Sequence, residues 1–402
     1  MKKHILVVSQ YFHPESFRIN DICTEWVKRG YKVTVVTGIP NYPQGEFFEG
    51  YGWFKRRKEK WNGIDIIRLP LIARGHSSVG MALNYLSFVV SGFIWKLFTR
   101  IKADYVFTFE VSPMTQALIG VWYAKKRHIP HYLYVQDLWP ENVEIVTGIH
   151  SPAIIKPIDR MVDYIYRKTK IVFTTSPSFV NNIKSRRNFD KHTKVIYWPQ
   201  YAEEFYKPVR NASVPEIPDD DSFKVIFTGN IGYAQGLDIL PRTAGLLKNE
   251  NVKFVIVGDG RYMEEFRAEI SKLDVNDKFV MVPRQPAERI PELLGACDVA
   301  FLSFMDTELF EMTIPAKLQS YMACGMPILA AASGETRRII EEAECGICSR
   351  IGNAEALADS IRKLMDPEIS DTKVMSGNSR EYFISHFEKK KLMDYIDNYF
   401  VR

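Results

Sequence analysis

The sequence has few cysteines, no internal repeat and no low-complexity segment. Five cysteines in 402 residues exclude a disulfide-stapled fold and suggest a reducing compartment. Two of them form Cys345-Gly-Ile-Cys348, but no second Cys or His pair lies at zinc-binding spacing, so we predict no metal site. Lys and Arg total 53 against 48 Asp and Glu, and this mild excess does not indicate a nucleic acid partner.

The N-terminal region lacks both a long apolar run and a glycine-rich loop. The apolar run Ile5–Val8 is too short for a signal peptide, and we expect a cytoplasmic protein. The loop at 9–20 contains no glycine, whereas dinucleotide-binding loops need GxGxxG, which argues against a dehydrogenase. Glu15 lies in this loop. Its carboxylate either caps the following helix or acts in a catalytic cleft.

Short apolar runs alternate with amphipathic segments in both halves of the chain. Such alternation predicts parallel sheets covered by helices on both faces. Because two such series are present, we predict an α/β protein with two doubly wound, Rossmann-like domains facing each other across a cleft. The predicted strands are His4–Val8, Lys32–Thr37, Asp65–Leu69, Tyr105–Phe109, His131–Val135, Ile171–Thr175, Lys194–Tyr197, Lys224–Thr228, Lys253–Val257, Phe279–Val282, Val299–Ser303 and Ile328–Ala331.

A segment with three prolines and three consecutive aspartates, 207–222, has the composition of a linker. We therefore predict an N-terminal domain over 1–206 and a C-terminal domain over 223–378. The remaining segment, 379–402, is rich in aromatic and charged residues and is predicted to be a helix that packs back onto the first domain.

Candidate catalytic residues follow an apolar strand of the first half. Asp137 and Glu141 bracket a Trp-Pro turn directly after Tyr132–Val135. Ligands bind at the carboxyl ends of parallel strands, where two carboxylates can share general-base, general-acid and hydroxyl-orienting roles. The alternative is that these carboxylates are solvated or cap a helix.

Candidate anion-binding residues lie in the second half. Gly229, Asn230 and Gly232 belong to a glycine-containing loop between a strand and a helix, where backbone N–H groups and the helix N-terminus favour an anion. Further along, Glu311, the amides of Thr313 and Ile314, and Lys317 lie at the start of another predicted helix. Amides, helix dipole and lysine together suit a diphosphate.

These motifs resemble those of GT-B fold glycosyltransferases of family 4, in the right order and over nearly the whole chain. Within that family, Gln136–Glu141 and Gly229–Gly232 resemble the branch that includes bacterial L-fucosaminyltransferases of O-antigen and capsule synthesis. The matching motifs are Tyr11-Phe-His-Pro-Glu15, Lys28–Thr37, Pro40-Asn-Tyr-Pro43, Gln136-Asp-Leu-Trp-Pro-Glu141, Gly229–Asp238, Gly258-Asp-Gly260, Pro315-Ala-Lys317 and Met322-Ala-Cys-Gly-Met-Pro327.

The resemblance implies transfer of a sugar from a UDP-sugar, bound mainly by the C-terminal domain, without a metal or other cofactor. It further suggests an N-acetylated deoxyhexosamine such as N-acetyl-L-fucosamine as the donor sugar. The acceptor would be an undecaprenyl-diphosphate-linked saccharide in O-antigen or capsule synthesis, bound by the N-terminal domain. Two other functions stay open: a sugar-nucleotide epimerase on the same two-domain plan, and a catalytically inactive sugar-nucleotide sensor.

Several positions depart from the family pattern. Ser320 occupies the place of the second Glu of the usual Glu-x7-Glu pair, and Glu311 lies nine residues before it. The lysine that many members carry in the first C-domain loop is Gln235. Lys317 is our candidate for the missing cation, with Arg284 or Arg261 as alternatives. The cleft histidine of many members aligns near Gln136 and Asp137.

Two segments suggest contact with a membrane. Residues 75–95 include no Asp, Glu, Lys or Arg, and Tyr51–Trp61 interleaves five cations with aromatic side chains. Basic residues beside interfacial aromatics suit an anionic lipid surface. We expect peripheral contact with the inner face of the cytoplasmic membrane. A buried helix of the first domain and a true membrane span are the alternatives.

Overall fold

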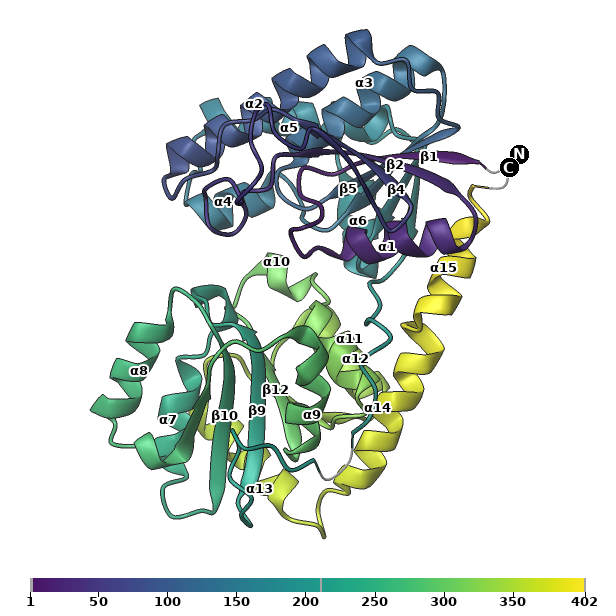
Figure 1. Cartoon of the computed structure of the whole chain (residues 1–402). Coiled ribbons are helices and arrows are strands. Elements are labelled where there is room, and N and C mark those ends of the chain that lie inside the picture. The colour runs from purple at the N-terminus through teal and green to yellow at the C-terminus, as the bar shows by residue number, and fades with distance from the viewer. Residues whose placement is uncertain (1–2, 210–211, 401–402) are drawn as a thin grey trace. The chain divides into compact units, whose positions relative to one another are not determined.

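The computed structural model describes residues 3–209 and 212–400 and divides into two compact units (Figure 1). The first unit extends to Trp198 and also includes the segment from Asn398 onward; the second extends from Pro199 to Asp397. Each unit contains one mainly parallel sheet with helices against it, so the predicted Rossmann-like architecture of both domains is confirmed.

The sheet of the first unit has eight strands in the order β3-β4-β2-β1-β5-β6-β7-β8. All neighbouring strands pair in parallel except β3, which pairs antiparallel with β4 at the sheet edge. Parallel strands buried on both faces explain the continuous apolar runs of the sequence. The strands are β1 (His4–Val8), β2 (Lys32–Gly38), β3 (Lys58–Trp61), β4 (Ile64–Leu69), β5 (Tyr105–Glu110), β6 (His131–Val135), β7 (Ile171–Thr174) and β8 (Lys194–Tyr197).

Helices cover both faces of this sheet. In Figure 1, α2, α3 and α5 lie on one face and α1 on the other. The core between the sheet and the α2–α3 pair contains Leu6, Val36, Phe88, Ile119 and other side chains removed from solvent. The helices are α1 (Arg18–Lys28), α2 (Ser78–Phe98), α3 (Ala117–Arg127), α4 (Glu141–Thr147), α5 (Pro152–Arg167) and α6 (Pro177–Ser185).

The sheet of the second unit has six parallel strands in the order β11-β10-β9-β12-β13-β14. The strands are β9 (Phe223–Asn230), β10 (Val252–Asp259), β11 (Phe279–Val282), β12 (Val299–Ser303), β13 (Ile328–Ala331) and β14 (Gly346–Ser349). The helices are α7 (Ile239–Leu246), α8 (Met263–Lys272), α9 (Ile290–Gly295), α10 (Glu308–Glu311), α11 (Ala316–Ala323), α12 (Gly334–Glu342), α13 (Ala354–Met365), α14 (Thr372–His386) and α15 (Lys389–Asp397).

The segment expected to be a linker, 207–222, packs on the second unit. Val214 and Ile217 are buried, and Glu216 forms an ion pair of 2.6 Å with Arg289. Asp220 pairs with Lys253 at 2.6 Å as well. Side-chain contacts therefore hold this proline-rich, acidic segment on the surface of the second unit. Residues 210–211 lie outside the described residues.

The expected helix over 379–402 is in fact two helices that belong to the second unit. Helix α14 packs on α11, where Arg380 donates a hydrogen bond of 2.5 Å to the Ala323 carbonyl. Of the described residues in this segment, Asn398 to Phe400 belong to the first unit. Phe400 is fully buried there against Trp26, and the Tyr399 carbonyl accepts a hydrogen bond of 2.8 Å from Tyr132.

Candidate active-site residues

The carboxyl ends of β9 and β10 approach each other closely because each strand has glycine as its second-last residue. Gly258 pairs with Gly229 in the sheet, and a Cβ on Gly258 would lie 1.9 Å from the Gly229 carbonyl oxygen. A Cβ on Gly260 would lie 2.2 Å from the Ile231 carbonyl oxygen. Gly229 and Gly258 also have positive φ, at 131° and 143°, which side chains of L-residues rarely adopt. The predicted glycine loop therefore leaves bare backbone at this edge of the sheet.

Lys317 lies across this bare backbone. Its Cε would be 3.1 Å from a Cβ on Gly229, its Nζ donates a hydrogen bond to Oε1 of Gln235, and Nζ lies 3.9 Å from the centre of the Phe227 ring. Within the described residues no carboxylate comes within ion-pair distance of this ammonium group. Burial lowers the pKa of Lys317 to about 7. The structure thus brings together Lys317, Gly229 and Gln235.

The segment before Lys317 is anchored by a short capped helix. Thr307 caps α10 by accepting a hydrogen bond of 3.3 Å from the Phe310 N–H. The N–H of Thr313 donates to the Phe310 carbonyl at 3.2 Å and is therefore already used. The N–H of Ile314 makes no hydrogen bond to any described residue. The Glu311 side chain is exposed, while its carbonyl contacts Gly334, whose Cβ position would lie only 2.0 Å from that oxygen.

Ser320 and Asn230 occupy different settings around Lys317. Ser320 is buried one turn into α11, where its hydroxyl donates to the Ala316 carbonyl at 3.1 Å. Asn230 is exposed at the tip of β9, and its amide nitrogen would lie 2.6 Å from a Cβ on Gly232, so glycine at 232 gives the Asn230 side chain room.

Arg284 belongs to a neighbouring cavity of about 540 Å³ at the ends of β10 and β11. Gly258 forms part of the lining, so the cavity adjoins the Gly229 backbone over which Lys317 lies. Arg261 and Arg267 line it too, and all three arginines are exposed and form no ion pair with a described residue. Both arginine alternatives from the sequence therefore lie in one cavity, whose lining also includes Asp259 and Glu264.

In the first unit, Asp137 and Glu141 follow β6 but have different partners. Asp137 accepts a hydrogen bond of 2.7 Å from the Ser112 N–H, and burial raises the pKa of its carboxyl. Glu141 starts α4 and accepts a hydrogen bond of 3.3 Å from Asn182. No hydrogen bond joins the two side chains. Ser112 connects several residues of this loop, because its hydroxyl also accepts hydrogen bonds from the side chains of Trp139 and Asn142.

Glu110 is a buried carboxyl that we had not singled out as a site residue. It ends β5, next to β6, and is fully removed from solvent. Burial, with a smaller contribution from Asp137, raises the pKa of Glu110 well above its usual value. The signal in the sequence was a glutamate at the end of the apolar run Tyr105–Phe109, directly before the predicted loop.

Glu15 holds two loops together. Its Oε1 accepts hydrogen bonds from the N–H groups of Asn41 and Tyr42, at 2.9 and 2.7 Å, and its Oε2 accepts one from Phe12 at 3.3 Å. The pKa of this buried carboxyl rises to about 7 because desolvation outweighs those bonds. Phe17 precedes α1 and no side chain caps it. Of the two alternatives, the helix cap is therefore wrong, and the carboxyl already has three backbone donors.

Among the described residues, no group of three or more His, Cys, Asp or Glu side chains is placed to hold a metal ion. Helix α2 is long and apolar enough to cross a membrane by length and composition. Within the 18-residue window that meets this criterion, 17% is buried inside the structure. One face of α2 packs on the first unit through Asn84, Phe88 and Gly92.

Two family models match the chain, one in each unit. The model for "Glycosyl transferase 4-like domain" matches residues 16–197, and that for "Glycosyl transferases group 1" matches residues 210–382. Between them they cover most of both sheets.

Individual relatives match over varying lengths. The "Putative colanic acid biosynthesis glycosyl transferase WcaI" of Escherichia coli is 25% identical over 90% of this chain and 92% of its own. The "Probable glycosyltransferase WbjE" of Pseudomonas aeruginosa is 26% identical over 62% of this chain; that match spans 64% of WbjE, less than two thirds of its length. The solved structure of Anabaena Alr3699/HepE in complex with UDP has a TM-score of 0.69, with 17% identity over 100% of this chain and 99% of the other.

Proposed function

Because the chain belongs through both of its units to the glycosyltransferases of the GT-B fold, we propose that it transfers a sugar from a UDP-sugar to a lipid-linked saccharide. One observation carries the proposal: Lys317 lies over the bare backbone of Gly229 with no carboxylate partner among the described residues. A half-buried ammonium group without a counter-charge is stabilised by an arriving anion.

Uridine diphosphate is the expected anion. Its diphosphate would bind Lys317, the Ile314 amide and the amino end of α11, and its nucleoside would occupy the adjoining cavity lined by Arg284. The HepE structure with UDP and a further one with UDP-glucose support this choice of nucleotide. With the leaving diphosphate stabilised in this way, transfer needs no metal ion.

The donor sugar and the polymer follow from the sequence motifs and from the relatives. The motifs at Gln136–Glu141 and Gly229–Gly232 support an N-acetylated deoxyhexosamine such as N-acetyl-L-fucosamine. WcaI is named for colanic acid biosynthesis, and AmsK of Erwinia amylovora, 24% identical over 36% of this chain and 36% of its own, for amylovoran biosynthesis. We place the reaction accordingly in bacterial surface polysaccharide synthesis, with an undecaprenyl-diphosphate-linked acceptor.

The chemical step breaks the bond between the sugar C1 and the diphosphate oxygen and forms a bond from C1 to an acceptor hydroxyl oxygen. The hydroxyl proton must leave, and the diphosphate must accept negative charge. In this proposal Asp137 accepts that proton or orients the acceptor hydroxyl. Glu141 orients the acceptor, and Lys317 stabilises the negative charge on UDP. Glu311, which is exposed beside Gly334, contacts the donor sugar. Ser320, on α11, belongs to the same donor site.

The location proposed is the inner face of the cytoplasmic membrane. The exposed side of α2 carries an apolar stripe with alternating spacings of four and three residues: Val79, Leu83, Leu86, Val90, Phe93 and Leu97. Phe54, at 93% exposure, and Trp53 extend from the loop after Tyr51, where Lys55 and Arg56 are exposed as well. Apolar side chains flanked by cations suit a peripheral position on anionic lipid.

Incubation with a panel of UDP-sugars, with and without a lipid-linked acceptor, tests this function. Acceptor-dependent release of UDP, unaffected by EDTA, is the expected result. Isomerisation of the donor without acceptor would identify an epimerase instead. Tight UDP-sugar binding without turnover under any condition would identify a sensor, and activity that returns only with added magnesium or manganese would contradict metal-independent transfer.

A further inference from the structure

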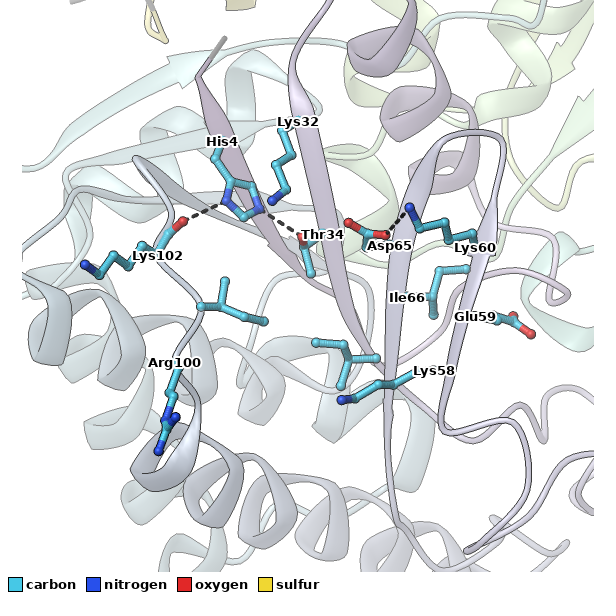
Figure 2. A pocket seen from close by; sticks show the side chains of 12 residues that line it. His4, Lys32, Thr34, Lys58, Glu59, Lys60, Asp65, Ile66, Arg100 and Lys102 are labelled. Carbon is cyan, nitrogen blue, oxygen red and sulfur yellow. Dashed lines mark hydrogen bonds and ion pairs between the residues drawn. The ribbon is translucent and has the colours of Figure 1, made fainter. Parts of the chain in front are cut away.

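One cavity of the first unit lies along β3, β4, β2 and β1, away from β6, the strand that Asp137 follows. Its volume is about 820 Å³, and its walls come from the starts of β1 and β2, from Asp65–Ile67 of β4, from β3, and from the segment that follows α2 (Figure 2). Strands β1 and β5 lie between β2 and β6, and neighbouring strands are about 4.8 Å apart. The cavity is therefore separate from the residues proposed for sugar transfer.

The cavity is strongly cationic. Five lining residues are basic, and two are acidic: Lys32, Lys58, Lys60, Arg100 and Lys102 against Glu59 and Asp65. Glu59 is already paired with Arg68, and Asp65 faces Lys60 at 3.5 Å. The other four cations form no ion pair with any residue within 3–209 or 212–400. Like charges gathered without counter-charges favour a bound anion.

The wall beside Arg100 and Lys102 is fixed by His4. One ring nitrogen of His4 lies 2.7 Å from the Lys102 carbonyl oxygen, and the other 2.9 Å from the Thr34 hydroxyl (Figure 2). Asp104 accepts a hydrogen bond of 2.6 Å from the His4 N–H, and its own N–H donates to the His4 carbonyl. These bonds attach the segment after α2 to β1, so the cavity is held by buried contacts as well as by surface side chains.

An apolar surface begins where the cavity ends. Arg100 comes two residues after the last residue of α2, and the final turns of that helix expose Ile94, Leu97 and Phe98 to 51%, 47% and 79%. Lys126 donates hydrogen bonds of 2.8 Å to the carbonyls of Lys96 and Leu97, which adds a further cation at this end. An anionic group in the cavity can therefore belong to a molecule whose apolar part lies along α2.

We propose that this cavity binds the phosphate headgroup of an anionic glycerophospholipid, such as phosphatidylglycerol, in the bilayer on which α2 lies. The proposal rests on the peripheral membrane location given above. A phospholipid is favoured over the lipid-linked acceptor because the cavity lies along β3, β4, β2 and β1, apart from β6 and Asp137. It is favoured over free phosphate because the apolar end of α2 adjoins the cations.

Binding of soluble dihexanoyl phosphatidylglycerol, and partitioning into vesicles with phosphatidylglycerol, test the proposal on the full chain. The variant K58Q/R100Q/K102Q removes three unpaired cavity cations. The matched control K168Q/K170Q/K184Q removes three exposed lysines near α5, β7 and α6 of the same unit. At about 1 kcal/mol per cation, the cavity variant should partition about 100-fold more weakly, while the control loses less than about threefold.

Several results would overturn the proposal. Equal losses for the two triple variants would mean diffuse attraction without a headgroup site. Inorganic phosphate that competes as well as the short-chain lipid would mean a phosphate ion site, and binding of phosphatidylcholine at equal strength would mean no anion selectivity. UDP titration of each variant keeps the two proposals apart: failure to bind UDP contradicts the proposed transferase, whereas intact UDP binding with unchanged lipid binding contradicts only the headgroup site.

Discussion

Lys317 and Gln235 are joined by a hydrogen bond in which the ammonium Nζ donates to the amide Oε1, beside the backbone of Gly229. The amide oxygen accepts this hydrogen bond but supplies no negative charge to balance the ammonium group. With its pKa lowered to about 7 by burial, Lys317 is divided between charged and neutral forms at neutral pH. The charge of the site therefore depends on whether an anion is bound.

Replacement of Lys317 by Met should weaken UDP binding by about 10- to 150-fold, since a charge-assisted hydrogen bond contributes about 1.5–3 kcal/mol. The free energy of unfolding at pH 7 should rise, because Met can be buried without desolvating a charge. Calorimetric titration and urea denaturation measure the two effects, and Lys363→Met, on an exposed lysine of α13, is the control. Unchanged affinity in the folded variant would assign the diphosphate to Arg284 or Arg261.

UDP affinity should fall by up to about tenfold per pH unit above pH 7, because binding then requires Lys317 to take up a proton. The phosphate groups are already ionised in this range. Without ligand the sign is opposite for stability: the unfolded state binds this proton up to about pH 10.4, so the Lys317 contribution to stability rises from pH 7 toward that value. Binding heats in buffers of different ionisation enthalpy measure the uptake, and heats independent of buffer would contradict it.

Gln235→Glu should reduce UDP affinity at pH 7 by about tenfold, the scale of one charge-assisted contact. A carboxylate at this position pairs with Lys317, raises its pKa and opposes the incoming diphosphate. The decline of affinity between pH 7 and 9 should also become flatter than in the parent protein. Affinity equal to or above that of the parent protein would show that the diphosphate binds elsewhere.

Asp137→Asn should lower acceptor-dependent UDP release by about 100-fold, within the range for loss of one general base or acid. UDP affinity should stay unchanged, because Asp137 and the Lys317 site belong to different units. Steady-state rates at saturating acceptor, combined with UDP titration, separate the two quantities. A fall in UDP affinity with no change in turnover would remove Asp137 from the chemical step.

The double variant Leu86→Gln/Val90→Gln should release the protein from anionic vesicles while it remains folded. Both side chains are at least half exposed, so their replacement should change the free energy of unfolding by no more than about 1 kcal/mol. The control Leu246→Gln/Val374→Gln alters exposed apolar residues of the second unit. Flotation reports binding, and a loss of several kcal/mol of stability would show that α2 is core.

The sequence predicted both sheets because buried parallel strands are continuous apolar runs. It failed for β3 and β14, which are edge strands. The four residues of β3, Lys58-Glu-Lys-Trp61, show no apolar run, and we interpreted them only as a basic aromatic surface. The sequence nevertheless contains a hairpin signal, the Asn62-Gly63 pair that follows β3 directly. In the structure both residues have the positive φ of a tight turn.

The candidate site was predictable where backbone geometry dictates residue type. Gly229 and Gly258 are glycines because a Cβ on Gly258 would clash with the Gly229 carbonyl oxygen. Lys317 was predicted from its position at the start of a helix, α11. Side-chain partners were less accessible. Glu15 follows a strand just as Asp137 does, and only the folded chain shows that three backbone N–H groups converge on it. The sequence does not show that Glu110 is fully buried, because its register against Val135 of β6 appears only in the folded sheet.

The position of Phe400 determines when the first unit can complete its folding during synthesis. Its ring lies among Trp26, Tyr105, Phe107 and Tyr132, so this aromatic cluster of the first unit lacks a member until nearly four hundred residues have been synthesised. Domains that emerge early usually fold while translation continues. Here the first unit must wait for a late segment to complete its interior, and nascent chains released before residue 400 should carry an exposed aromatic pocket that chaperones recognise.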